Sequence, residues 1–251
     1  MPELKRFIDI HSHIVFGADD GAQSLWEAMQ LLKLDRDEGA FAVFATPHYG
    51  RENNNYVPDA AMVMRNFELL KERAAEEVPE VRLYLGTEWY CAWDLADRVR
   101  RRDAFRMNDT NCVLTEFAEW CGLHEDPDVI VENLTRLKEG GYQPILAHAE
   151  RFRALQEDWD LARRIWEEGT LLQVNAYDLH LNSSARTRDL AQWLAKERLA
   201  SFVGSDMHGT RRGARKPRMK EGLAWLYEHT DEAYADAVAF GNAQKYFNLE
   251  V

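Results

Sequence analysis

Residues 7–21 read Phe-Ile-Asp-Ile-His-Ser-His-Ile-Val-Phe-Gly-Ala-Asp-Asp-Gly, an apolar segment that runs out into histidines and carboxylates. Asp9, His11 and His13 alternate along it, so in an extended strand their side chains lie on one face. Imidazole nitrogen and carboxylate oxygen are ligands for divalent transition ions. A His-x-His motif is weak on its own, and the metal site that it predicts here depends on the rest of the chain.

Short apolar runs alternate with helix-like segments from this first strand onward. Strands are predicted at residues 6–10, 41–45, 81–85, 112–115, 144–147, 170–174 and 200–203. Helices are predicted between them at 24–38, 58–77, 93–102, 128–139, 157–168 and 184–198. Strict alternation favours parallel strands, and seven such units favour an α/β barrel or near-barrel over an open sheet.

Composition limits the class of protein. The chain has 251 residues and 46% hydrophobic content, which predicts a single domain over residues 1–251. No apolar run approaches the roughly 18 residues of a membrane span, and the first residues do not resemble a signal peptide, so we expect a cytoplasmic protein without membrane insertion. A net charge of −12 argues against a nucleic-acid-binding surface.

The three cysteines, Cys91, Cys112 and Cys121, are odd in number and lack metal-ligand spacing, so we expect buried thiols rather than disulfides. A thiol-based phosphatase needs an arginine six positions after its cysteine, and those positions hold Asp97, Ala118 and Pro127. That class of phosphatase is excluded. A phosphate-binding G-x-x-x-x-G-K-[ST] loop does not occur in the sequence either.

Six of the seven predicted strands finish on histidine, aspartate or glutamate. In a parallel barrel the carboxyl ends of all strands open onto the same face, where barrel enzymes have their active sites. Residues far apart in the sequence therefore become neighbours around one cavity. The side chains in question, in chain order, are Asp9, His11, His13, His48, Glu88, Glu116, His148, Asp206 and His208.

These motifs resemble a known family. D-x-H-x-H and D-D-G at residues 9–21, then T-P-H, G-x-E, x-E-F, A-H-x-E-R and S-D-M-H, are similar in order and spacing to the PHP superfamily (polymerase and histidinol phosphatase). The most similar branch is the bacterial capsule-type metal-dependent protein tyrosine phosphatases. The resemblance runs from about Phe7 to past Pro217. It implies a distorted, TIM-like (β/α)7 barrel of the PHP type.

The resemblance also implies a set of site residues. Two to three divalent metal ions would be bound, with manganese the first choice and iron, zinc or magnesium the alternatives. Glu88 would bridge two ions, and Asp9 would support a neighbouring imidazole from behind. The implied metal ligands are His11, His13, Asp20, His48, Glu88, Glu116, His148, Asp206 and His208.

Two arginines complete the implied site. Arg151 matches an arginine that the family places just after the histidine of the fifth strand. A second arginine follows the last histidine, but the segment 209–218 is longer here than in the family. Arg215 is the best match, with Arg211 or Arg212 as alternatives. One guanidinium group can donate two parallel hydrogen bonds to phosphate oxygens, so these arginines imply a phosphate-binding role.

The implied activity is hydrolysis of phosphotyrosine by a metal-bound hydroxide. A tyrosyl leaving group, with a pKa near 10, needs less help from a general acid than a serine alkoxide does. The implied partner is a phosphotyrosine protein, namely the tail of a membrane-linked tyrosine autokinase in capsular or exopolysaccharide synthesis, and the oligomeric state stays open. The alternatives are a PHP phosphoesterase for a small metabolite such as histidinol phosphate, a C–N hydrolase on a related barrel, and a metal-holding module without catalysis.

Overall fold

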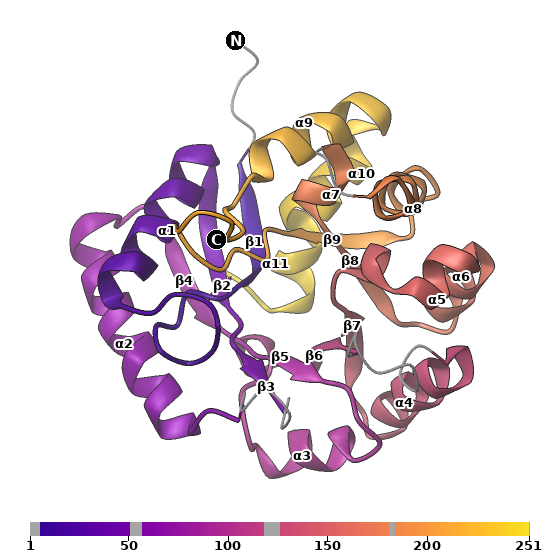
Figure 1. Cartoon of the computed structure of the whole chain (residues 1–251), viewed down its shortest axis with the longest axis horizontal. Coiled ribbons are helices and arrows are strands. Elements are labelled where there is room, and N and C mark those ends of the chain that lie inside the picture. Colours follow the sequence, from indigo (N-terminus) through magenta and orange to yellow (C-terminus); the bar gives the residue numbers. More distant parts are fainter. Residues whose placement is uncertain (1–5, 51–56, 118–125, 181–183, 251) are drawn as a thin grey trace.

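The computed structural model describes residues 6–50, 57–117, 126–180 and 184–250, and Figure 1 shows strands at the centre surrounded by helices. The strands are β1 (Phe7–Ser12), β2 (Ala40–Ala45), β3 (His48–Tyr49), β4 (Arg82–Leu85), β5 (Glu88–Tyr90), β6 (Cys112–Glu116), β7 (Gln143–Leu146), β8 (Leu171–Asn175) and β9 (Ala200–Gly204). The helices are α1 (Leu25–Glu38), α2 (Ala60–Glu77), α3 (Leu95–Arg101), α4 (Pro127–Glu139), α5 (Arg153–Glu157), α6 (Trp159–Glu167), α7 (Ala176–His180), α8 (Ala185–Lys196), α9 (Met219–His229), α10 (Glu232–Asp236) and α11 (Asn242–Tyr246).

The strands form two parallel sheets, one in the order β1-β2-β4 and one in the order β3-β5-β6-β7-β8-β9. Each of the seven predicted strands corresponds to one of the observed strands. The difference lies at β2 and β4, because the chain leaves each of them and continues as a second short strand, β3 or β5, in the other sheet. Pro47 stands at the first break, where it has no N–H to donate. Its carbonyl oxygen accepts a hydrogen bond from the Glu88 amide.

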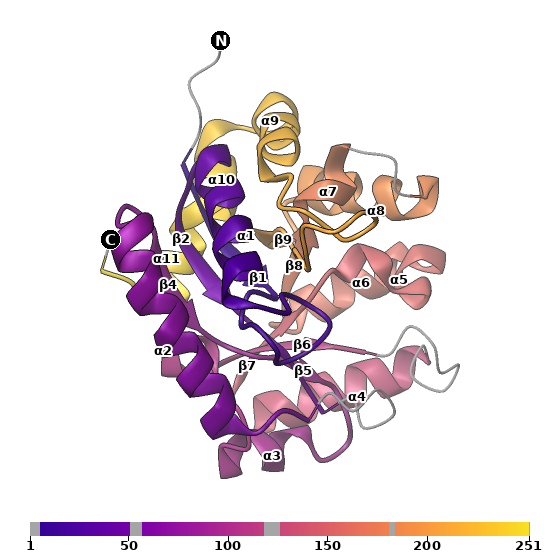
Figure 2. The same ribbon diagram turned by 60° about the vertical axis from the view of Figure 1, so that its left-hand side comes forward.

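The outermost strands of the two sheets meet where β1 and β9 end. Ser12 and Met207 form an isolated parallel bridge, the Asp206 amide donates to the carbonyl of His11, and the His13 amide donates to the carbonyl of Met207. Figure 2 shows β1 and β9 side by side in a second view. The architecture is therefore a distorted α/β barrel, as predicted, in which the strands are divided between two sheets.

Buried apolar side chains form two clusters. Ile8, Phe44 and Phe202 belong to an interior cluster, and a larger cluster lies between the strands and the surrounding helices. Phe247, which follows α11, stacks on Phe202 with ring centroids 5.4 Å apart. The helices α9 to α11 were not among the predicted elements. Their last residues pack on the side of Ile8, which lies toward the amino-terminal end of β1, so the opposite end of the barrel stays available for polar residues.

Each of the six predicted helices corresponds to an observed helix apart from its ends, whereas α5 and α7 were not predicted. The predicted helix 157–168 corresponds to α6 and is preceded by the short helix α5. Ser24 caps α1 by accepting a hydrogen bond from the Glu27 amide, which fixes where that helix begins. None of the helices in the described residues is long and apolar enough to cross a membrane. Cys91 and Cys112 are buried free thiols, and Cys121 lies outside the described residues.

Candidate metal centre

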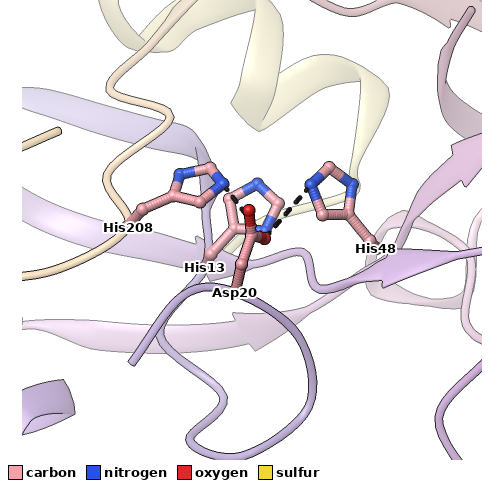
Figure 3. Close-up of side chains that lie close together, drawn as sticks. All are labelled: His13, Asp20, His48 and His208. Atoms are coloured by element: carbon pink, nitrogen blue, oxygen red, sulfur yellow. Dashed lines mark ion pairs between the residues drawn. The ribbon is translucent and has the colours of Figure 1, made fainter. Parts of the chain in front are cut away.

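The predicted ligands converge at the carboxyl ends of the strands. Their ligand atoms form three overlapping groups, in each of which the atoms lie within 4.8 Å of one another. The groups are His13, Asp20, His48 and His208; His11, His13 and Glu88; and His48, Glu88 and Glu116. Figure 3 shows the first group, in which the ring of His13 lies between those of His48 and His208 and Asp20 faces all three. His148 and Asp206 border these groups.

Glu88 is the carboxylate that the groups share. Its Oε2 lies 3.3 Å from Nε2 of both His11 and His13, and 2.9 Å from Nδ1 of His48. Its Oε1 lies 2.8 Å from Nε2 of His148. The side chain is completely buried, and it stands at the first residue of β5, just after the break in the strand. One carboxylate facing four imidazoles has the position that a bridging ligand needs.

The donor set fits divalent cations. Nε2 of His11 and Nε2 of His13 face each other at 3.2 Å in a buried site, and Oε2 of Glu88 lies 3.3 Å from both. Buried polar atoms normally have a partner, and several that point at a common position are the usual sign of an ion-binding site. Mixed imidazole and carboxylate ligands suit Mn, Fe and Zn.

The rings of His13 and His11 are held in position by side chains for which the sequence analysis predicted no role. Nδ1 of His13 lies 2.7 Å from the Asp19 carboxylate, and Nδ1 of His11 lies 3.1 Å from the side-chain oxygen of Gln173. Such contacts fix the ring orientation and tautomer of metal-binding histidines. The prediction that Asp9 does this is wrong. Its carboxylate accepts from the hydroxyl and amide of Ser205 and from the amide of His11, so it holds two strand ends together.

Charges in the cluster act on its neighbouring groups. Burial raises the pKa of Glu88, but the positive charges of His11 and His48 outweigh it and hold that pKa well below its ordinary value. Burial likewise raises the pKa of Asp206, but the positive charges of Arg215 and His11 outweigh burial and hold that pKa well below its ordinary value. Burial and the adjacent His13 hold the pKa of His208 well below its ordinary value. Glu88, Asp206 and His208 are therefore held in the forms that bind metal, whereas for His48 the charges of Glu116 and Glu88 outweigh burial and raise the pKa to about 10, so that a cation has to displace a proton there.

Both predicted arginines contact the carboxylate of Asp206. Arg151 donates to Oδ2 of Asp206 at 3.2 Å and to Asp178 at 2.8 Å, and Arg215 donates to Oδ1 of Asp206 at 3.0 Å. Arg215 is thus the candidate of the segment 209–218 that reaches the cluster. Arg211 donates instead to the backbone oxygen of Asp20. Asp178, in α7, was missed because nothing in the sequence places its carboxylate beside Arg151, which lies 27 positions earlier.

The fold and the site together define a class, namely a parallel α/β barrel with a buried histidine and carboxylate cluster at the carboxyl ends of its strands. Within that class, the family model "Capsular polysaccharide synthesis, CpsB/CapC" matches residues 7–248. The chain belongs to the CpsB/CapC family.

Individual relatives cover nearly the same length. The tyrosine-protein phosphatase CpsB of Streptococcus agalactiae serotype V is 27% identical over 245 residues, which are 94% of this chain and 96% of that protein. The putative tyrosine-protein phosphatase CapC of Staphylococcus aureus is 29% identical over 201 residues, 80% of this chain and 76% of that one. A solved structure from work on YwqE of Bacillus subtilis and CpsB of Streptococcus pneumoniae, described as metal-dependent tyrosine phosphatases, superposes with a TM-score of 0.84 at 24% identity and covers 97% of this chain and 95% of its own.

Proposed function

We propose that this protein is a metal-dependent protein-tyrosine phosphatase that acts in capsular or exopolysaccharide synthesis. The observation that carries the proposal is the buried cluster around Glu88 with two guanidinium groups at its edge, in a chain of the CpsB/CapC family. Imidazoles and carboxylates hold cations, and the arginines supply the paired donors that a phosphate needs. The relatives named above are described as tyrosine phosphatases, which favours phosphotyrosine over a small metabolite such as histidinol phosphate.

The residues divide the work as follows. The nine predicted ligands would hold two to three divalent cations, with manganese as the first candidate, and Glu88, which belongs to two of the three ligand groups, would be shared between cations. Such cations supply charge that stabilises a phosphoryl group and activates water. Arg151 and Arg215 bind phosphate oxygens and keep the phosphorus centre beside the cluster. Asp178 and Asp206 hold those guanidinium groups in place.

The leaving group and the nucleophile follow from the same chemistry. A tyrosyl oxygen leaves with a pKa near 10 and needs little protonation, so aryl phosphates are the easier substrates. Burial raises the pKa of Cys91 to about 12 and that of Cys112 to about 11, which leaves neither thiol ionised near neutral pH. The attack therefore does not use either of these thiols. The proposed partner is a phosphotyrosine-bearing protein, such as the tail of a membrane-linked tyrosine kinase.

A combined metal and substrate assay tests the proposal. Purified protein should contain more than one equivalent of divalent metal, lose p-nitrophenyl phosphate hydrolysis in a chelator and regain it with Mn²⁺. Phosphotyrosine peptides should be cleaved at least about tenfold faster in kcat/KM than phosphoserine peptides, a ratio that corresponds to about 1.4 kcal/mol of barrier. His11→Ala should abolish both activities, and His180→Ala, which changes an exposed histidine outside the cluster, should not. Full activity without metal, or a preference for histidinol phosphate, would contradict the proposal.

A further inference from the structure

A cavity adjoins the metal centre. It has a volume of about 360 Å³ and is formed by the segment 209–218, which follows β9, together with α7. We call it the basic pocket, after the side chains that line it, which include Tyr177, Arg211, Arg212, Arg215, Lys216 and Arg218. Five cationic residues within ten positions stand out in a chain whose net charge is −12.

Most of these cations lack an acidic partner. Among the described residues, Arg212, Lys216 and Arg218 form no ion pair with a carboxylate. Most of the other described arginines on the surface are paired, as in Arg136 with Glu132 at 2.5 Å and Arg163 with Glu197 at 2.8 Å, so three unpaired cations within one segment are unusual in this chain. An uncompensated group of positive charges in a concavity concentrates the local field and attracts anions.

The basic pocket and the metal centre share a wall. Arg215 lines the pocket, and the same guanidinium contacts Asp206 and lies 3.1 Å from both ring nitrogens of His208. The backbone amide of His208 also donates to the carbonyl of Arg215, which ties the segment to the cluster. A group bound in the pocket is therefore next to a phosphate bound at the cluster. One polypeptide substrate can reach both.

The pocket also has an aromatic element. The guanidinium of Arg218 lies over the ring of Tyr177, 5.7 Å from its centroid, which holds the arginine at the wall of the cavity. Tyr177 lies two residues after Asn175, whose side chain donates to Asp206 of the cluster. The wall is thus anchored on the same strand end that supports the proposed active site.

We infer that the basic pocket binds a second oxyanion of the substrate, either an acidic side chain or another phosphotyrosine close in sequence to the one being hydrolysed. This inference rests on the proposed function and adds a substrate preference to it. The pocket is concave and shares Arg215 with the edge of the metal centre, which favours a peptide. An anionic membrane surface is a poorer partner, because the chain as a whole is strongly acidic.

The test uses Lys216→Gln combined with Arg218→Gln, two residues outside the proposed catalytic set. The matched control, Arg164→Gln combined with Lys245→Gln, removes one arginine and one lysine from exposed positions on α6 and α11. Each protein is assayed on p-nitrophenyl phosphate and on three phosphotyrosine peptides, whose neighbouring residues within three positions are neutral, acidic or doubly phosphorylated. Affinity is measured in parallel with peptides that carry a non-hydrolysable phosphonate in place of phosphotyrosine.

The unchanged protein should prefer the acidic or doubly phosphorylated peptide over the neutral one by about tenfold in kcat/KM and in Kd. This preference should be smaller at high salt, because salt screens exposed charges. The pocket variant should lose most of that ratio and keep its rate on p-nitrophenyl phosphate, and the control should keep both. The acidic and the doubly phosphorylated peptides tell the two sources of the oxyanion apart.

Three results would overturn the inference. One is an equal Kd for neutral and anionic peptides with the unchanged protein. The second is a pocket variant whose kcat/KM falls by the same factor on every substrate. The third is a pocket variant that no longer binds anionic phospholipid vesicles but keeps its preference for anionic over neutral peptides. Because the Kd arm does not need turnover, an inactive protein that still prefers anionic peptides would contradict the phosphatase proposal and leave the pocket as an anion site.

Discussion

Asp206 is the residue on which the histidines and the arginines converge. Its Oδ1 lies 3.5 Å from Nε2 of His13 and 3.0 Å from Arg215, and its Oδ2 accepts from Arg151 and Asn175. Asp206 also has a positive φ of 53°, a conformation that costs energy in a residue with a side chain and is concentrated at functional sites. One buried carboxylate thus positions both arginines relative to the histidine cluster.

The arginines give the residue-scale prediction. Arg151→Ala and Arg215→Ala should each lower kcat/KM for p-nitrophenyl phosphate by about 100-fold, the usual loss when one preorganised charge-stabilising donor is removed. Arg153→Ala is the matched control, because this exposed arginine lies two residues from Arg151 and pairs with Glu157. Steady-state kinetics give the effect, and metal analysis of each variant separates lost phosphate binding from lost metal.

A silent Arg215→Ala together with a damaging Arg211→Ala or Arg212→Ala would show that the wrong arginine of the segment 209–218 has been chosen. Arg215→Lys adds a further control. It keeps the charge but not the planar pair of donors, so it should recover only part of the activity.

At the scale of elements, the sequence predicts what has a clear period or a clear boundary. The strand 200–203 is a run of apolar and small residues, and the helix that starts after Ser24 has a capping residue. Both elements are therefore predicted from the sequence and present in the structure. The strands β3 and β5 have two and three residues, too few for a periodic pattern. Glu88 was therefore predicted as the end of a strand, although it begins β5. The side chains that hold the histidines, Asp19 and Gln173, were missed because their role depends on distances between elements.

The contact between α1 and β1 carries a pH prediction. Asp35 of α1 is completely buried, and Asp9 of β1 and Glu38 of α1 face it. Burial, followed by the negative charges of Asp9 and Glu38, raises the pKa of Asp35 well above its ordinary value. A group whose pKa is higher in the folded than in the unfolded chain stabilises the fold while it is protonated. That stabilisation is complete below the ordinary pKa and is lost as the pH rises through the raised one.

Asp35→Asn cannot lose a proton, so its Tm relative to the unchanged protein should rise as the pH increases from 5 to 8. The measurement is thermal unfolding of both proteins at several pH values with metal content held constant. Asp37→Asn, which changes an exposed carboxylate on the same helix, should show no such trend. A difference between Asp35→Asn and the unchanged protein that stays constant or shrinks with rising pH would refute the assignment.

At the scale of the whole molecule, the candidate metal centre lies where the two sheets meet. His11 comes from β1 of the three-stranded sheet, whereas His48, Glu88 and Glu116 come from the six-stranded sheet. His208 follows β9 and lies close to His13, with ring centroids 3.9 Å apart. Beside the bridge between Ser12 and Met207 and the hydrogen bonds of Asp9 with Ser205, the cluster is a further polar link between the two sheets. Bound cations would therefore join the two halves of the barrel as well as serve the reaction.

This arrangement predicts a large effect of metal on stability. A ligand that binds only the folded chain at about 1,000 times its Kd adds about 4 kcal/mol, which for a chain of this length raises Tm on the order of 10 °C. Scanning calorimetry in chelator, and again after Mn²⁺ is restored, should show Tm fall and recover. His11→Ala should weaken the response and His180→Ala should keep it, whereas a Tm that is the same with and without metal would mean that the cluster does not join the sheets.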